Sequence, residues 1–417
     1  MNDKALKRGR TMYVMEAALE YFISIMVAGS FLATLTSELG FSDSLTGILS
    51  SIISLGCLFQ LLSIFIRCQR VKGLVVFLSI FNQILFMLLY VIPIVNIGKT
   101  AKTVIFVILI FSAYFIYNLA HPKKINWLMS LVDDSKRGSF TATKEIISLI
   151  SGIIFSFAMG AVIDYFSEIG KIKEGFIVSA VTIFVLMTLH SLTMIFAVER
   201  NDHRPAEKNF MRALRDLVKN RNVMRVTILF ILYYASTYVS TPFYGTYQIN
   251  ELGMGLTFVS AIVMCGSISR ATISRFWGKY ADKNSFTKMI RNCLVFLALS
   301  QLCVIFAVPE TGKVAFVLYY ILHGVALGGI NSALINLIFD YVPTEQRSDS
   351  LAITQAAAGL TGFLTTLFVS PLVTLIQKNG NRIFGLPLYA QQFVTVIALI
   401  FTVTAIVYTT FAFNKKQ

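Results

Sequence analysis

Long apolar runs, separated by short polar segments, follow one another along the whole chain. A bilayer span needs roughly 20 apolar residues, and a backbone inside a bilayer must satisfy its own hydrogen bonds, so each run predicts a membrane-spanning helix. The sequence therefore predicts twelve helices, which lie near residues 11–36, 44–66, 73–96, 101–130, 139–165, 174–198, 223–250, 256–277, 287–308, 313–340, 348–376 and 388–413.

The longest polar stretch separates the sixth predicted helix from the seventh. Within it, Phe210, Leu214 and Leu217 recur at helical spacing with basic residues between them, a pattern typical of an amphipathic helix on a membrane surface. This break predicts three parts: an N-terminal six-helix bundle over residues 1–198, a cytoplasmic linker with an amphipathic helix over residues 199–222, and a C-terminal six-helix bundle over residues 223–417.

The two predicted bundles resemble each other at an offset of 210 residues, without gaps, between residues 103 and 164. Arg137 falls on Arg347, Gly152 falls on Gly362, and the predicted helix ends coincide as well. A repeat of this kind predicts an all-α membrane protein built from two pseudo-symmetric six-helix bundles.

Composition narrows the class of function. Of the 417 residues, 56% are hydrophobic and 14% are charged, and the mean hydropathy is +0.72. A soluble domain carries about 25% charged residues, so a water-soluble enzyme is excluded. The five cysteines have no metal-type spacing, and the chain contains neither GxxxxGK[ST] nor HExxH. We expect no catalytic residues, no metal and no cofactor.

The formal net charge of +15 is unevenly distributed. If Met1 is cytoplasmic and the spans alternate, most lysines and arginines fall in cytoplasmic connections, which is the positive-inside bias. Membrane orientation explains this charge better than nucleic-acid binding does. We predict a multi-pass protein of the cytoplasmic membrane with both termini cytoplasmic. The basic residues expected on the opposite side are Lys99, Lys102, Lys171, Lys173, Lys313, Lys378 and Arg382.

A short motif, GKYADKNSFTK, occupies residues 278–288 after the eighth predicted helix. It resembles the G-x-x-x-D-[RK]-x-G-x-[RK]-[RK] loop of the major facilitator superfamily, with Ser285 in place of the second glycine. The first-half copy, at residues 67–72, contains no acidic residue, and the family's antiport pattern is absent from the fifth helix.

The resemblance implies a transporter fold in which this loop stabilises one of two alternating conformations. It gives the switching role to Gly278, Asp282 and Lys283. The same role is expected for Arg137 and Arg347, which lie at the starts of the fifth and eleventh helices and are also similar to the family. Asp282 suits the positive end of a nearby helix, and Lys283 suits an anionic membrane surface. An ordinary basic turn is the alternative.

Two carboxylates fall where a charge is unfavourable. Glu16 and Glu20 are four residues apart on the first predicted helix and therefore share a face. A charge at the centre of a span costs roughly 2.5–3.5 kcal/mol, and two close carboxylates favour proton binding by one of them. We predict that Glu16 and Glu20 couple transport to protons; a structural pair satisfied by neighbouring lysines is the alternative.

The fourth predicted helix contains Lys123, Lys124 and Asn126 next to Pro122. The repeat aligns both lysines with the interior of the tenth helix, ten or more residues from the helix end. We predict that they and Asn126 bind substrate, and that a lysine pairs or competes with Glu20. The pattern leaves open which lysine faces inward, and whether both extend to the cytoplasmic surface instead.

Substrate contacts are also predicted in the C-terminal bundle. Arg270 lies in an apolar run and needs an acidic or carbonyl partner or an anionic substrate, and His323 and Asn331 are polar groups of the tenth helix. Tyr233 matches Glu20 in the repeat, and Tyr238 belongs to the same tyrosine cluster. Interior hydrogen bonding and interfacial tyrosines are the alternatives.

These features predict a secondary active transporter that moves a small polar or anionic solute by alternating access, coupled to protons. Its predicted partners are that small-molecule substrate, protons and the lipid bilayer, with no nucleic acid, and its predicted state is a monomer. The missing antiport pattern favours symport or facilitated uptake, and the sequence leaves import and export open. The alternatives are a non-transporting receptor or sensor on a transporter scaffold, and a drug exporter of the same superfamily.

Overall fold

Helices account for most of the described residues in the computed structural model. The structure describes residues 3–62, 71–132, 137–199, 220–341, 347–383 and 385–413. The predicted amphipathic helix of the linker lies outside these residues.

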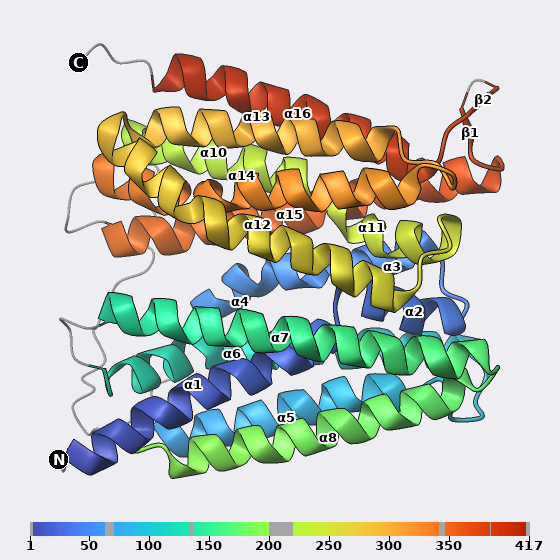
Figure 1. The fold of residues 1–417 in the computed structure, drawn as a ribbon, viewed down its shortest axis with the longest axis horizontal. Coiled ribbons are helices and arrows are strands. Elements are labelled where there is room, and N and C mark those ends of the chain that lie inside the picture. Colours follow the sequence, from blue (N-terminus) through green and yellow to red (C-terminus); the bar gives the residue numbers. More distant parts are fainter. Residues whose placement is uncertain are drawn as a thin grey trace. The chain divides into compact units, whose positions relative to one another are not determined.

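By their contacts, the residues form two compact units, each with its own set of helices (Figure 1). The first unit comprises Met1–Phe41, Phe59–Ala206 and Gly255–Ser260, and the second comprises Ser42–Leu58, Glu207–Met254 and Ala261–Gln417. Two short segments, residues 42–58 and 255–260, therefore pack with residues that are distant in the sequence.

The helices of the first unit are α1 (Asp3–Met26), α2 (Gly29–Glu38), α5 (Val71–Val91), α6 (Lys99–Met129), α7 (Arg137–Glu168) and α8 (Ile172–Phe196). The second unit contains α3 (Asp43–Ser51), η1 (Ile52–Leu55), α10 (Arg221–Tyr238), η4 (Thr241–Phe243), α11 (Tyr244–Thr246), η5 (Tyr247–Glu251), α13 (Phe286–Ile305), α14 (Gly312–Tyr341), α15 (Arg347–Lys378), β1 (Arg382–Ile383), β2 (Leu386–Pro387) and α16 (Ala390–Ala412). Helices α4 (Gly56–Leu62) and α12 (Leu256–Lys283) begin in one unit and continue in the other.

Ten helices in the described residues are long and apolar enough to cross a membrane, or eleven when α1 and α2 are one span bent by 41°. The predicted all-α membrane fold is confirmed. The predicted second helix differs: it consists of α3, η1 and α4, because a 3₁₀ turn at Ile52–Leu55 interrupts it. The predicted first helix is also broken, since Gly29 has a φ of +53°, which other residues rarely adopt.

The predicted seventh helix stops earlier than its apolar pattern suggests. α10 ends at Tyr238, and a 3₁₀ turn with Pro242 and a π-turn at Tyr247–Glu251 carry the chain onward. Proline has no backbone N–H and cannot continue an α-helix without losing a hydrogen bond. The break therefore follows from the sequence, although apolar periodicity does not reveal it.

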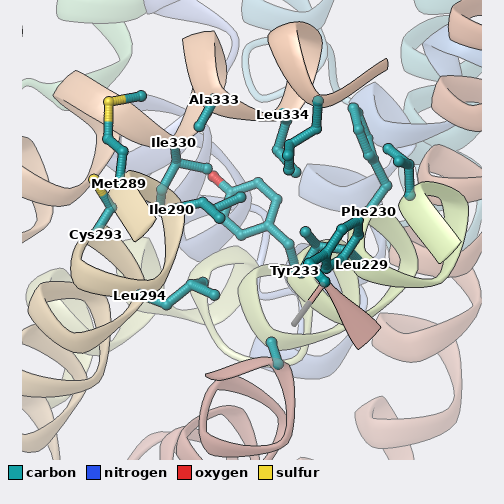
Figure 2. Packing of buried hydrophobic residues seen from close by; sticks show 14 of the residues in the cluster. Leu229, Phe230, Tyr233, Met289, Ile290, Cys293, Leu294, Ile330, Ala333 and Leu334 are labelled. Carbon is teal, nitrogen blue, oxygen red and sulfur yellow. The ribbon is translucent and has the colours of Figure 1, made fainter. Parts of the chain in front are cut away.

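The core of the second unit is a cluster of apolar side chains from α10, α12, α13 and α14 (Figure 2). Leu229 and Phe230 of α10 are buried, as are Met289 and Ile290 of α13. Burial of such side chains away from solvent is the general driving force for packing within each unit. In the first unit, a separate cluster surrounds Trp127.

Two carboxylates, Asp164 and Asp43, form hydrogen bonds with segments that are far away in the sequence. In the first unit, Asp164 of α7 accepts hydrogen bonds from the backbone N–H groups of Leu256 (2.9 Å) and Thr257 (2.8 Å) at the start of α12. A Cβ at Gly160 would lie 3.1 Å from that backbone, so the small residue permits the close approach. Asp164 thus caps a helix that begins 92 residues later.

The second unit contains a comparable arrangement around Asp43 of α3. Its carboxylate accepts hydrogen bonds from Asn250 (3.0 Å), Gln377 (2.8 Å) and Gln391 (2.8 Å). Asp43 is buried, and amide donors from three other segments satisfy it. The hydroxyl of Ser370 on α15 also donates to the backbone oxygen of Ser44.

We expect Asp164→Ala to lower the free energy of unfolding by about 0.5–2 kcal/mol, because it leaves two N–H groups of α12 without their acceptor. Asp164→Asn is the matched control, since it keeps one acceptor oxygen and should lose less. Thermal unfolding of the purified protein in detergent measures both. Equal stability of Asp164→Ala and the wild type would show that the cap contributes nothing.

Candidate functional site

The interior of the first unit contains a lysine between two carboxylates. Glu16 and Glu20 lie one turn apart on α1, and Lys124 comes from α6. The Lys124 Nζ lies 2.7 Å from Glu16 Oε1 and also pairs with Glu20 Oε2. Glu16 is 2% exposed and Lys124 is 3% exposed, so this is a buried ion pair. The spacing of four residues on α1 is what brings both carboxylates to one ammonium.

A histidine and two neutral side chains complete this cluster. His190 of α8 places Nε2 3.2 Å from Glu16 Oε1 and 3.6 Å from Glu20 Oε2. Its Nδ1 lies 3.0 Å from Gln83 Nε2 of α5. The Tyr117 hydroxyl on α6 donates to Glu20 Oε1 at 3.1 Å. Three helices of one unit, α1, α6 and α8, therefore contribute to the charged cluster, defined as Glu16, Glu20, Lys124 and His190.

The charges of the charged cluster do not balance when His190 is neutral. Two carboxylates and one ammonium leave one excess negative charge, and one added proton cancels it. A net charge in a low-dielectric interior is unfavourable, so the cluster is suited to bind a proton. The acceptor can be the imidazole or a carboxylate.

Three side chains of the charged cluster, Glu16, Glu20 and His190, are of kinds that commonly bind metal ions. One ligand atom each from Glu16, Glu20 and His190 lie within 4.8 Å of one another. The Lys124 ammonium contacts both carboxylates and already supplies the positive charge that such a set would attract. A metal ion would have to displace this ammonium, so the arrangement fits a proton better than a resident metal.

The structure distinguishes the two predicted lysines. Lys124 is buried in the charged cluster, whereas Lys123 is half-buried and Asn126 is exposed. The alternative in which Lys124 extends to the membrane surface is therefore wrong. The expected distance of ten or more residues to the helix end is also wrong, because α6 ends at Met129 and the Ser130 hydroxyl donates to the Trp127 carbonyl there.

The polar residues predicted in the C-terminal half lie in the second unit. Arg270 is exposed on α12 and lies within electrostatic range of Tyr233 and His323. The His323 ring stacks on Tyr319, with centroids 5.0 Å apart and an interplanar angle of 16°. Asn331 is exposed on α14.

The two predicted tyrosines have largely structural surroundings. Tyr233 is 7% exposed, and its ring packs in the apolar cluster beside Leu229 and Ile330 (Figure 2). Tyr238 stacks on Tyr234, with centroids 5.6 Å apart. These contacts give both rings a packing function whether or not they meet a substrate.

The family-like motif forms a helix end. α12 continues through Gly278 and Asp282 to Lys283, all of which are exposed, and α13 begins at Phe286. Ser285, in place of the family's glycine, caps α13, because its side chain accepts a hydrogen bond from Lys288 N at 3.2 Å.

The first-half counterpart of this motif lacks an acidic residue in its own sequence, but a carboxylate is present. Glu199 Oε1 accepts hydrogen bonds from Val71 N (2.6 Å) and Lys72 N (3.0 Å) at the start of α5. Arg137 and Arg347 begin α7 and α15, as expected, and their side chains lie outside the described residues. The acid at this helix end therefore comes from a distant part of the chain.

Sequence reasoning missed His190, Gln83, Tyr117 and Glu199. His190 is one of only four histidines, and it interrupts an apolar helix, which is a signal that could have identified it. Gln83 gives a similar but weaker signal in α5.

The helical architecture and the charged cluster can now be compared with known proteins. The profile of the Major Facilitator Superfamily matches residues 17–366 of the chain. The chain belongs to the major facilitator superfamily. This is a transporter family, which agrees with a multi-pass membrane protein that is not an enzyme.

Several solved structures of superfamily transporters are similar in fold. The nucleoside transporter NupG has a TM-score of 0.69 and 16% identity, with 100% of each chain covered. A bacterial homologue of the iron transporter ferroportin, in the inward-facing state, has a TM-score of 0.70 and 14% identity, with 99% of each covered. The D-xylose–proton symporter has a TM-score of 0.65 and 12% identity, with 95% of this chain and 97% of that chain covered. A search of curated proteins found no match.

We expect Lys124→Met alone to lower the free energy of unfolding by about 3–5 kcal/mol, because it leaves two buried carboxylates without their cation. The triple variant Glu16→Gln, Glu20→Gln and Lys124→Met removes all three charges and should recover most of the lost free energy of unfolding. Thermal unfolding in detergent compares the two. A triple variant no more stable than Lys124→Met would contradict the ion-pair account.

Proposed function

We propose that this major facilitator superfamily protein is a secondary active transporter that moves a small polar or anionic solute across the cytoplasmic membrane by alternating access. In the proposal, transport is coupled to protons by symport. The observation that carries it is the charged cluster, in which a buried lysine contacts two carboxylates that a histidine contacts as well.

The proposed coupling step is the binding of one proton by the charged cluster. In its present arrangement Gln83 donates to His190 Nδ1, so Nε2 carries the ring proton and donates to Glu16. The buried Gln83 Oε1 has no hydrogen-bond partner among the described residues. A half-turn of this amide would present Oε1 to a protonated Nδ1, and the imidazolium would balance the excess negative charge.

Proton binding would also weaken the electrostatic attraction between the two carboxylates and Lys124. The ammonium contacts both carboxylates, and a proton on the cluster weakens their combined attraction for it. Lys124 would then be available to an anionic group of the solute. This reciprocal competition between Lys124, proton and solute is the proposed link between the proton gradient and transport.

Arg270, His323 and Asn331 of the second unit are proposed to bind solute as well. Arg270 comes from α12 and His323 from α14, two helices that approach closely at Gly266 and Gly324. A guanidinium binds carboxylate or phosphate groups in a bidentate manner. Asn331 offers a further polar contact. Gly278, Asp282 and Lys283 are proposed to act in the conformational switch.

The proposed orientation places both termini in the cytoplasm. The uneven distribution of lysines and arginines supports it, since cytoplasmic loops of membrane proteins carry more basic residues. Family membership supports transport as such, and the similarity to a proton symporter, at 12% identity, supports only the shared fold.

We expect anionic solutes to raise the melting temperature of the protein in a panel of sugars, organic anions and organic cations, because a ligand that binds the folded state stabilises it. Arg270→Gln should lower the apparent affinity for anions, derived from these shifts, about tenfold, which is the effect expected for the loss of a charge-assisted contact. Arg275→Gln, another exposed arginine on α12, is the control. Equal affinity in both variants would exclude Arg270 from recognition.

We expect Glu20→Gln to abolish gradient-driven accumulation in proteoliposomes while leaving solute exchange intact, because the neutral amide removes the excess charge that attracts the proton. The solute is one that shifts the melting temperature, and the driving force is an imposed pH gradient. Glu38→Gln, which changes an exposed carboxylate, is the control. Accumulation by Glu20→Gln at the wild-type level would disprove proton coupling through this residue.

A further inference from the structure

The second unit brings two carboxylates together at one end of its helices. Asp43 is the first residue of α3, and Glu251 is the last residue of η5. A single nitrogen, Nε2 of Gln377 on α15, donates to Asp43 Oδ2 at 2.8 Å and to Glu251 Oε1 at 3.3 Å. The two carboxylates therefore share one site. Asp43 is 7% exposed, whereas Glu251 is half-buried, so the site is reached from the surface on the side of Glu251.

The negative charge of this site is not neutralised. In the part of the chain that the structure describes, the ion pairs involve other carboxylates than Asp43 and Glu251. Lys378 at the end of α15 and Arg382 in β1 are exposed. The start of α3 places a partial positive charge near Asp43, but Glu251 stands at the end of a helix, where the partial charge is negative. Neutral amide donors satisfy the oxygen atoms and leave both charges in place.

Two amide oxygens at the same site have no hydrogen-bond partner among the described residues. One is Oε1 of Gln391 on α16, a residue with 0% exposure whose Nε2 donates to Asp43 Oδ2 at 2.8 Å. The other is Oδ1 of Asn381, whose Nδ2 lies 3.4 Å from both carboxylate oxygens of Glu251. A buried oxygen without a partner is unfavourable. Each of these oxygens belongs to an amide that already contacts one of the carboxylates.

We propose that this site binds a calcium ion through the carboxylates of Asp43 and Glu251 and the amide oxygens of Gln391 and Asn381. Calcium takes six to eight oxygen ligands in flexible geometry, and carboxylates, amide oxygens and water are its usual ligands. Two carboxylates match its charge. Magnesium requires a nearly ideal octahedron, and transition metals prefer nitrogen or sulfur ligands, which these four side chains do not offer.

A rotation of two amides would complete the proposed site. A half-turn of the Gln391 or Asn381 amide exchanges its N–H₂ group with its oxygen, so the oxygen without a partner turns toward the carboxylates and an ion between them. The bound ion would replace the lost N–H contacts and join α3, η5, the segment after α15, and α16. This proposal concerns ion binding by the second unit and does not depend on the proposed transport activity.

The test is calcium binding by the full chain, purified in detergent, treated with a chelator and titrated with calcium chloride at constant ionic strength in a calorimeter. We expect the wild type to bind calcium at one saturable site, more tightly than magnesium, and to melt at a higher temperature when calcium is bound. Glu251→Gln should lower the calcium affinity about tenfold or more, because it removes one of the two ligand charges. Glu310→Gln, which changes an exposed carboxylate of the same unit, should have no effect.

A second variant and a second measurement separate ion binding from folding. Asn381→Gly removes one amide oxygen, and glycine accommodates the φ of +54° at this position, so calcium affinity should fall while the fold is kept. With chelator present, Glu251→Gln should melt no lower than the wild type, since it removes a like charge beside Asp43. A wild type that binds no calcium, or variants that bind it as tightly, would overturn the proposal. So would a melting temperature that rises with acid but not with calcium, because the two carboxylates would then share a proton.

Discussion

The buried contact of Lys124 with Glu16 and Glu20 is the interaction on which the interior of the first unit depends. Each of these charges is tolerable only because the others are present, since an uncompensated charge in a low-dielectric interior is strongly unfavourable. His190 and Tyr117 complete the hydrogen bonding. Folding stability and the proposed proton binding therefore depend on the same few groups, so we expect a substitution that changes one of them to change the other.

The fold class was predictable because the bilayer imposes one solution on a long apolar run. The interruptions were harder to predict. Gly29 breaks the first apolar run by its positive φ, and Pro242 ends the seventh, whereas the 3₁₀ turn at Ile52–Leu55 has no sequence signal of comparable strength. Local backbone chemistry, rather than hydrophobicity, determines where these helices stop.

The candidate site was predictable only in part, for a similar reason. The spacing of Glu16 and Glu20 predicts a shared face, because both lie on one helix. The choice of Lys124 over Lys123, and the presence of His190 and Gln83, depend on how α5, α6 and α8 rotate against α1. Glu199 shows the same limit, since it reaches α5 from a position 128 residues away from Val71. Packing between helices is not encoded in any local pattern.

The hydrogen bonds of Asp43 have a consequence for biosynthesis. Its donors come from positions 250, 377 and 391, so the carboxylate emerges from the ribosome long before its last donor, Gln391. Chains are made from the N-terminus onward, and a buried carboxylate without donors is unfavourable. We therefore expect the segment that begins at Asp43 to reach its final place only after α16 has been synthesised.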